Sequence, residues 1–206
     1  GHTSLYEVPA EGVYVVLGRT RDDAAGEAFD KVAKLLGLGY PGGPVIDRLS
    51  QGANDAAVPF KIAKMSDRRP DFSFSGLKTA VLYHVRREDI SPVTSPDQVP
   101  TVVRDLVASF QRAAVDALLL GLARAARERR PRSLLLTGGV AANTLLRSEG
   151  ARVAAELGLP FFVPPLHLTT DNAAMIGAAG FVAFQKGVRA GRDLDAEAGL
   201  KLGLRE

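Results

Sequence analysis

The amino-acid sequence predicts an α/β protein, and three observations lead to that class. Residues 133–187 show the pattern of strand, helix, strand and helix in succession, the order of a parallel α/β unit. Residues 101–128 repeat apolar side chains at i, i+3, i+4 and i+7, the spacing of a long amphipathic helix. Two short strand-like runs, 5–8 and 13–17, flank the sequence Pro-Ala-Glu-Gly and predict a hairpin at the start of the chain.

The segment after the hairpin is expected to be mostly helical. Apolar residues at helical spacing predict a helix over 22–38, which Gly37 or Gly39 can end. Residues 40–44 read Tyr-Pro-Gly-Gly-Pro and predict a tight turn, because two glycines between two prolines leave few other conformations. A short helix over 45–51 follows. Residues 54–71 have little periodicity and are expected to form a loop.

The rest of the chain contains the predicted helices and the second pair of strands. Residues 75–87 predict a helix, and three prolines within 88–100 predict an exposed connection to the long helix of 101–128, which Pro131 ends. We then expect a short strand over 133–137 buried on both faces, a helix over 140–157 and a strand over 160–163. A helix over 170–186, capped by Thr170 or Asp171, comes last. Residues 188–206 carry weak structural signals.

The composition excludes several classes of protein. The 206 residues carry 26 basic and 23 acidic side chains, a net charge of +3, and 46% are hydrophobic, which is typical of a globular chain. The absence of cysteine excludes a disulfide scaffold, a zinc ribbon and thiol catalysis. The first ten residues lack the basic start and apolar run of a signal peptide, and no run approaches 18 apolar residues. These features agree with a cytoplasmic location.

A strand followed by two glycines is the strongest local signal for a ligand site. Leu134 to Thr137 lead into Gly138-Gly139 and then into a predicted helix that holds Asn143 in its first turn. Glycines let a ligand approach the backbone, and free N–H groups at a helix start suit phosphate or ribose oxygens. Asn143 can supply both a donor and an acceptor. An ordinary strand-to-helix turn would have the same sequence.

Four carboxylates stand close together near the start of the first predicted helix: Asp22, Asp23, Glu27 and Asp30. The first two are explained by the positive end of the helix dipole, which favours acidic residues there. Asp30 lies two turns further on, where the dipole does not account for it. We therefore expect Asp30 to be the site residue of this group.

The remaining candidates are weaker. Asp171 precedes a helix of small residues, where it is either an N-cap or a hard oxygen ligand for a metal. His2, His84 and His167 form no H-x-x-x-H pair, and His84 is expected to be structural. The Phe-Ser-Phe-Ser sequence at 72–75 alternates two aromatics with serines, which favours core positions or a stacking surface.

An arginine-rich stretch is the main feature of the charge distribution. Seven arginines lie between Arg104 and Arg132, against three acidic residues. Such a stretch is either an electrostatic surface for nucleic acid or a solvated helix end. The part over 124–132 is our candidate surface for tRNA.

Five segments together resemble one family. GHTSL, DDAAGEAFDKVAKLLGLGYPGGP, FSFSGLKTAV, LLLTGGVAANTLLR and TTDNAAMIGAAG occur between Gly1 and Gly180 in the order of the TsaD/Kae1/Gcp family. These are the tRNA N6-adenosine threonylcarbamoyltransferases, formerly labelled O-sialoglycoprotein endopeptidases. The resemblance implies an ASKHA lobe, as in actin, Hsp70 and sugar kinases: an RNase-H-like mixed sheet flanked by helices. It also implies a helical insertion over about 44–130, a strand–helix core over about 131–187 and a tail over 188–206.

The resemblance implies a reaction and its ligands. A threonylcarbamoyl group passes from threonylcarbamoyl-AMP to N6 of adenosine 37 in tRNAs that read ANN codons. One divalent metal, Fe²⁺ or Zn²⁺, is implied for each full-length subunit, where it would orient and polarise the donor. The implied partners are tRNA and, in bacteria, the catalytically inert paralogue TsaB and the small ATPase TsaE. No membrane is implied.

The resemblance also carries over individual residues. Gly1 matches a glycine of the family's substrate-binding Ser-Gly-Gly-His-Thr turn. Asp30, Gly43 and Asp47 match positions that hold the donor's adenosine, and Asn143 matches a nucleotide contact. Asp171 matches the third metal ligand. The family's first lobe, with the H-x-x-x-H pair that supplies the other two ligands, has no counterpart in this sequence.

That difference sets our expectation for the chain by itself. We expect the second-lobe portion of a longer protein, inactive alone because one carboxylate cannot replace three ligands. A lobe without its partner lobe is expected to expose apolar surface, through which it can oligomerise. Two alternatives from other classes remain: a nucleotide-binding ASKHA module that acts as a scaffold, and a metalloendopeptidase.

Overall fold

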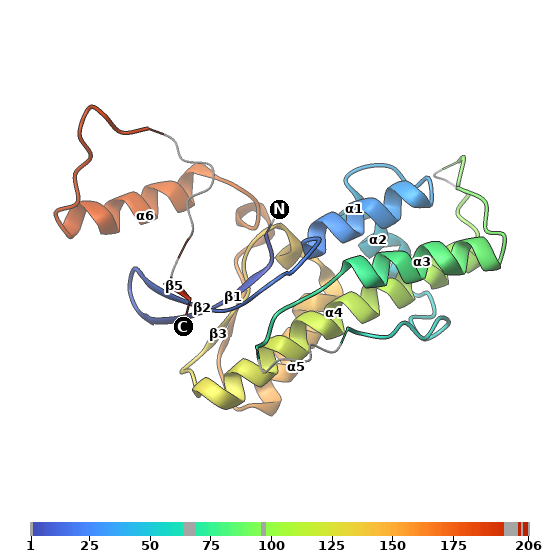
Figure 1. Ribbon diagram of the computed structural model, residues 1–206, viewed down its shortest axis with the longest axis horizontal. Coiled ribbons are helices and arrows are strands. Elements are labelled where there is room, and N and C mark those ends of the chain that lie inside the picture. The colour runs from blue at the N-terminus through green and yellow to red at the C-terminus, as the bar shows by residue number, and fades with distance from the viewer. Residues whose placement is uncertain (1, 64–68, 96–97, 196–201, 203, 206) are drawn as a thin grey trace.

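The fold combines a helical body with two small β-sheets, as seen in a computed structural model that describes residues 2–63, 69–95, 98–195, 202 and 204–205 (Figure 1). This arrangement confirms the predicted α/β class. The strands and helices follow one another as β1 (Ser4–Ala10), β2 (Val13–Arg19), α1 (Ala25–Leu35), α2 (Gly42–Ser50), α3 (Ser75–Arg87), α4 (Thr101–Arg129), β3 (Leu134–Leu135), the 3₁₀ turn η1 (Gly139–Ala142), α5 (Thr144–Glu156), β4 (Phe161–Phe162), the 3₁₀ turn η2 (Leu166–Leu168), α6 (Ala173–Gln185) and β5 (Leu204–Arg205).

The two sheets are separate in the described part of the chain. One has the order β1-β2-β5, with β1 antiparallel to β2 and β2 parallel to β5, so it is mixed. The other consists of β3 and β4, paired in parallel. The predicted hairpin is therefore confirmed, and so is the parallel pairing of the two late strands.

The long helix α4 forms the centre of the core. It contributes buried residues to clusters with α1 and α3 on one side and with α5 and β3 on the other. Phe29 and Phe110 meet edge to face at 5.1 Å between ring centroids, which fixes α1 against α4. By length and composition α4 is the one described helix that could cross a membrane, yet 61% of its most apolar window is buried inside the protein, as in a core helix.

Two helices of the helical body match their predicted bounds closely. The predicted range of α3 is the observed one, and α4 extends one residue beyond its prediction. In contrast, α2 begins at Gly42 rather than at residue 45, so two glycines of the predicted turn are helical. Its first N–H is satisfied from outside, because Gly42 donates to Asp30 Oδ1 at 2.8 Å.

The late strand–helix region departs from prediction at two points. Leu134 is buried but Leu135 is 64% exposed, so the expectation of a strand buried on both faces is wrong. The cluster around Leu134 is built from α4, α5 and β4, which cover one face. The helix expected from residue 140 begins at Thr144, with Asn143 as its N-cap and the 3₁₀ turn η1 before it.

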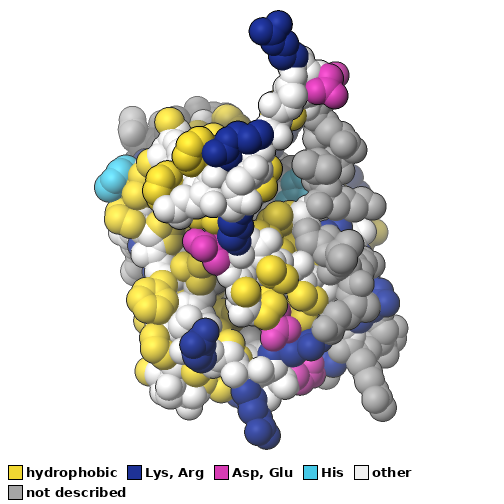
Figure 2. Space-filling view, turned by 90° about the vertical axis from the view of Figure 1, so that its left-hand side faces the viewer, with side chains coloured by type: hydrophobic (Ala, Val, Ile, Leu, Met, Phe, Trp, Pro, Cys, Tyr) yellow, Lys and Arg dark blue, Asp and Glu magenta, His cyan; other side chains and the backbone are white. Residues whose placement is uncertain are grey.

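The last helix, α6, lies apart from the helical body, beyond the β1–β2 hairpin (Figure 1). Its N-cap is Asn172, which accepts from the N–H of Met175 at 3.0 Å, so neither Thr170 nor Asp171 is the cap. None of its residues is buried, although nearly all are apolar. The view onto this side of the molecule shows hydrophobic side chains over much of the face (Figure 2).

Candidate functional site

The candidate site lies where α1, α2 and the turn before α5 meet. On α1, Gly26 and Asp30 are one turn apart and so face the same way. A Cβ on Gly26 would lie 3.3 Å from Val140 Cγ2, so the Gly138–Val140 turn packs directly on α1. Asp30 holds the start of α2 through the N–H of Gly42. Four of the residues matched by resemblance therefore lie on elements in mutual contact.

Asp47 joins α2 to the first turn of α5. Both of its carboxylate oxygens are 3.2 Å from the backbone nitrogen of Thr144, and Oδ1 accepts from the Thr144 hydroxyl at 2.8 Å. The carboxylate thus caps α5 from outside the helix, at the end where the helix dipole favours a negative charge.

Asn143 is almost fully buried and bonded at both ends of its amide. Its Oδ1 accepts from the N–H of Leu146 at 2.9 Å, and its Nδ2 donates to Gln111 Oε1 at 2.8 Å. Only 7% of Asn143 and 4% of Gln111 is exposed. The amide orientation is consistent with both partners, which leaves one N–H of the Asn143 amide for a further acceptor.

These contacts change the expected role of the α5 N-terminus. The sequence predicted free N–H groups there for a ligand anion. In the structure the N–H groups of Thr144 and Leu146 are already taken by Asp47 and Asn143. The prediction is wrong for these two N–H groups, because side chains of the protein cap them.

Three glycines leave open space beside these groups. A Cβ placed on Gly43, Gly138 or Gly139 would have no neighbouring atom within 4 Å. Gly138 also has φ of +93°, a conformation that favours glycine. The neighbouring Gly42 is different, because a Cβ there would lie 2.6 Å from the carbonyl oxygen of Phe29. The open side of the α2 start and of the glycine turn is thus the face on which a ligand can approach the backbone.

The other carboxylates of the acidic group have structural partners. Asp22 accepts from the hydroxyls of Ser73 and Ser75 at 2.5 and 2.7 Å and from the N–H of Phe74 at 2.8 Å. Burial alone would raise the pKa of Asp22, but these hydrogen bonds outweigh it and hold the pKa below its ordinary value. Asp22 therefore caps α3 from a distance, which explains the serines of the Phe-Ser-Phe-Ser sequence.

Asp23 and Glu27 are bound by lysine. Lys31 Nζ lies 2.6 Å from Asp23 Oδ1 and 2.7 Å from Glu27 Oε1. Lys78 is 3.6 Å from the other oxygen of Asp23. Asp22, Asp23 and Glu27 are therefore bound by serines, a backbone N–H and lysines rather than explained by the helix dipole alone. Asp30 also has a structural partner, the N–H of Gly42, and its role as a ligand residue stays a prediction.

Asp171 is the candidate metal ligand. It is exposed and lies just before α6. The described residues contain no group of three or more His, Cys, Asp or Glu side chains that could hold a metal. Gly1 lies outside the described residues.

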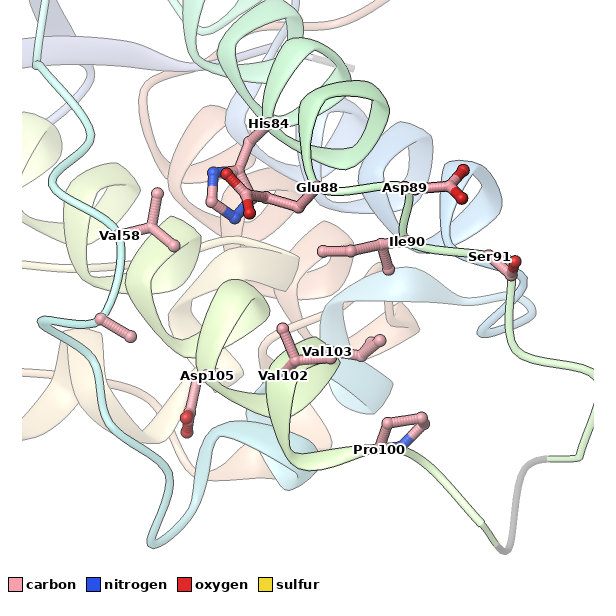
Figure 3. Close-up of a pocket in the computed structure, with 11 residues that line it drawn as sticks. Val58, His84, Glu88, Asp89, Ile90, Ser91, Pro100, Val102, Val103 and Asp105 are labelled. Atoms are coloured by element: carbon pink, nitrogen blue, oxygen red, sulfur yellow. The ribbon is translucent and has the colours of Figure 1, made fainter.

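The pocket shown in Figure 3 lies elsewhere, between the C-terminal end of α3, the N-terminal end of α4 and the loop after α2. Val58, Ile90 and Val103 are among its apolar lining residues, and Glu88 and Asp105 are among its acidic ones. Both carboxylates have partners on the protein: Glu88 bonds Arg87 at 2.8 Å, and Asp105 accepts from the N–H of Asn54 at 2.9 Å. It includes none of the predicted site residues.

The arginine-rich stretch divides into two parts. Arg112 pairs with Asp55 at 2.8 Å and with Glu149 at 3.4 Å, and Arg104 donates to two backbone carbonyls, so both stabilise the fold. Arg124 and Arg129 pair with Glu128 and Glu7. The exposed arginines near the end of α4 include Arg127, Arg130 and Arg132. Arg104 and Arg112 lie outside the candidate tRNA surface of residues 124–132, which stays a prediction.

Comparisons with known proteins agree on one family. The family model for tRNA N6-adenosine threonylcarbamoyltransferase (TsaD) matches residues 1–178. The protein of that name from Anaeromyxobacter dehalogenans is 51% identical over 203 residues, and the one from Thermosipho africanus is 45% identical over 202. Each alignment covers 98% of this chain and 59% of the relative. The chain thus spans about three-fifths of the length of these relatives.

A solved structure supports the fold at a coarser level. Crystalline HypF from T. kodakarensis superposes with a TM-score of 0.58, covering 80% of this chain and 20% of HypF. The sequence identity is 20%, so the likeness concerns the fold alone.

Proposed function

The chain belongs to the tRNA N6-adenosine threonylcarbamoyltransferase family, and from this premise we propose that it supplies the nucleotide-binding part of a protein that makes threonylcarbamoyladenosine in tRNA. In that reaction N6 of adenosine 37 bonds to the carbamoyl carbon of threonylcarbamoyl-AMP. The bond from that carbon to the phosphate oxygen breaks, and AMP and a proton leave. The observation that carries the proposal is the junction of α1, α2 and the α5 start, with its open glycine face.

The junction suits the adenosine part of the donor. We assign to Asp30 and Asp47 the role of accepting hydrogen bonds from ribose hydroxyls, since each carboxylate has lone pairs beyond those used by Gly42 and Thr144. Gly43 and the Gly138–Gly139 turn would allow the ligand close to the backbone. Asn143 would offer its second amide N–H. The family resemblance names Asp30, Gly43, Asp47 and Asn143 among these positions, whereas the Gly138–Gly139 turn comes from the strand-to-helix pattern of the sequence.

The metal is a separate matter. Asp171 would contribute one oxygen ligand, and Fe²⁺ or Zn²⁺ would act on the donor as a Lewis acid when bound. Among the described residues, Asp171 has no neighbouring group of His, Cys, Asp or Glu side chains that could complete that site. We propose that the other ligands belong to sequence found in the longer relatives, and that this chain alone does not transfer threonylcarbamoyl.

Membership of the family also suggests the fold, the location and the partners of the protein. We propose an ASKHA lobe that works in the cytoplasm with tRNA and, in a bacterial setting, with TsaB and TsaE. Arg127, Arg130 and Arg132 are the proposed tRNA contacts. A second candidate function, a nucleotide-binding scaffold, rests on the same junction and needs no metal. It predicts nucleotide binding without any transfer in the longer protein.

The test is a calorimetric titration of the 206-residue chain with AMP. We expect binding in the wild type and at least a tenfold loss of affinity in Asp30→Ala, since a hydrogen bond to a charged group is worth about 1.5–3 kcal/mol. Glu27→Ala is the matched control, because Glu27 lies one turn earlier on α1 and pairs with Lys31. Equal affinity in wild type and Asp30→Ala would refute the site assignment.

A further inference from the structure

Gln111 is a buried amide on the apolar helix α4. It is 4% exposed and lies among buried neighbours that include Val107, Phe110 and Val115. An amide removed from water costs free energy unless it is hydrogen-bonded, so a glutamine at this position calls for a specific partner. That partner is Asn143, 32 residues away in sequence.

The hydrogen bond to Gln111 determines which way the Asn143 amide points. One end of that amide is fixed by the N–H of Leu146, which binds Oδ1 as part of the α5 cap. The other end is fixed by Gln111 Oε1, which takes one hydrogen of Nδ2. With both ends fixed, the second Nδ2 hydrogen has one direction left. Without the acceptor on Gln111, the amide would be held by the helix cap alone.

We propose that Gln111 is a positioning residue for nucleotide binding, acting through Asn143 rather than by touching the ligand. This inference rests on the proposed function, because it takes Asn143 as a nucleotide contact. Gln111 sets the orientation of the remaining Asn143 N–H before the ligand arrives, so binding does not have to order that side chain.

Ser109 shows what a purely structural polar residue on α4 looks like. It is 2% exposed and two positions from Gln111 on the same helix. Its hydroxyl donates to the carbonyl of Asp105 at 2.8 Å and accepts from the N–H of Val58 at 3.1 Å, so it fixes the loop after α2. Both residues are therefore expected to matter for stability, while only Gln111 is expected to matter for the ligand.

The experiment compares Gln111→Met with Ser109→Ala in the 206-residue chain, using thermal melting and calorimetric titration with AMP. Both variants should melt at lower temperature. Only Gln111→Met should weaken AMP binding, by about tenfold, the upper range for loss of a neutral hydrogen bond. Gln111→Glu keeps an oxygen acceptor toward Asn143 and should restore most of the affinity. In an Asn143→Ala background, Gln111→Met should cause no further loss, because the two residues act as one unit.

Each outcome decides something. If AMP binds the wild type and Gln111→Met equally well, or if the effects of the Gln111 and Asn143 changes add, Gln111 is structural only and the proposed function stands. If AMP does not bind the wild type, the nucleotide site itself is refuted and the inference with it. Should Gln111→Met fail to fold, Gln111→Asn replaces it: its shorter side chain withdraws the acceptor, and unchanged AMP affinity would again overturn the inference.

Discussion

The carboxylate of Asp47 accepts hydrogen bonds from both the backbone nitrogen and the hydroxyl of Thr144, two residues separated by 97 positions in the sequence. This contact places a helix cap and a proposed ribose ligand in one side chain. The same atoms that would bind the donor also hold α2 against α5.

Replacing Asp47 should therefore affect stability and binding together. We expect Asp47→Ala to lower the free energy of unfolding by about 1–2 kcal/mol, as for loss of a helix cap. AMP affinity should fall as well. Thr144→Ala is the control, since it removes the hydroxyl bond at 2.8 Å but keeps the backbone one. It should destabilise less and leave AMP binding nearly unchanged. Urea unfolding and AMP titration measure the two effects, and equal AMP affinity in all three proteins would contradict the ribose role.

Substitutions at the two adjacent glycines of α2 are expected to separate an effect on AMP binding from an effect on stability. Gly43→Ala fills open space and adds helix propensity, so stability should stay within about 1 kcal/mol while AMP affinity falls. Gly42→Ala would place Cβ 2.6 Å from the Phe29 carbonyl oxygen and 2.7 Å from Ala33 Cβ, so it should destabilise strongly. Melting curves and AMP titrations distinguish the two. A Gly43→Ala variant with full AMP affinity would show that the ligand approaches from elsewhere.

Asp22 should make stability depend on pH in the acid range. Its pKa in the folded protein lies below the ordinary value of 3.8, because hydrogen bonds from Ser73, Ser75 and Phe74 outweigh the effect of burial. A lowered pKa means that the stabilisation is fully present above pH 3.8 and is lost as pH falls through the folded value. We expect Asp22→Asn to be less stable than the wild type near pH 6, with the difference shrinking below pH 3.8. A difference that stays constant down to pH 2 would assign the effect to something other than ionisation.

The arginines at the end of α4 should account for part of the salt dependence of tRNA binding. Reversing Arg127 and Arg130 to Glu should weaken binding of unmodified tRNA and reduce the slope of log K against log salt by about 1–2, since each lost phosphate contact contributes just under one. The matched control reverses Arg86 and Arg192, which are also exposed but lie outside α4. Filter binding at several salt concentrations measures the slope. The same slope in both double variants would show that the arginines at the end of α4 do not contact tRNA and form an ordinary solvated helix end.

Helix α6 should make the chain self-associate. Ile176 is 66% exposed and Phe181 and Phe184 are each 60% exposed, and a helix that is apolar on all sides is normally covered. We expect concentration-dependent association in sedimentation experiments, reduced by Ile176→Asp. The control is Leu120→Asp, which changes a side chain of similar exposure, 61%, on α4. Association that is unaffected by Ile176→Asp but lowered by Leu120→Asp would show that the self-association interface lies on the helical body and not on α6.

Local patterns in the sequence predict most of the elements, and they also single out Asp30 as a candidate site residue, a role that stays a prediction. The periodicity of apolar residues predicts the bounds of α3 and all but the last residue of α4. It can do so because the spacing of apolar residues within a single helix is a local property of the sequence. Asp30 could be singled out since it lies too far into α1 for the helix dipole to explain it. The sequence predicts a helix from residue 22, whereas α1 begins at Ala25, because Asp22 and Asp23 bind Ser75 and Lys78 instead of extending the helix.

The remaining site residues could not be found from local patterns. Asp47 came from the family resemblance alone, because a single carboxylate in a short helix forms no pattern and its partner is 97 residues away. Gln111 was missed, although one polar residue on the buried side of an apolar helix is a signal that can be read from sequence. Asn143 stays a predicted ligand residue. Its local role as the N-cap of α5 differs from the predicted place inside the first turn, and its tertiary contact with Gln111 leaves no local pattern in the sequence.

The central position of α4 has a consequence for how the protein unfolds. One helix supplies buried side chains to every hydrophobic cluster of the described chain, from Val103 at one end to Ala126 at the other. The helical body and the β3–β4 region therefore cannot open independently without breaking a continuous helix, so they should melt in one transition. Backbone amides in the middle of α4, around Phe110 to Val115, should exchange with deuterium only on global unfolding, whereas those of α6 should exchange early.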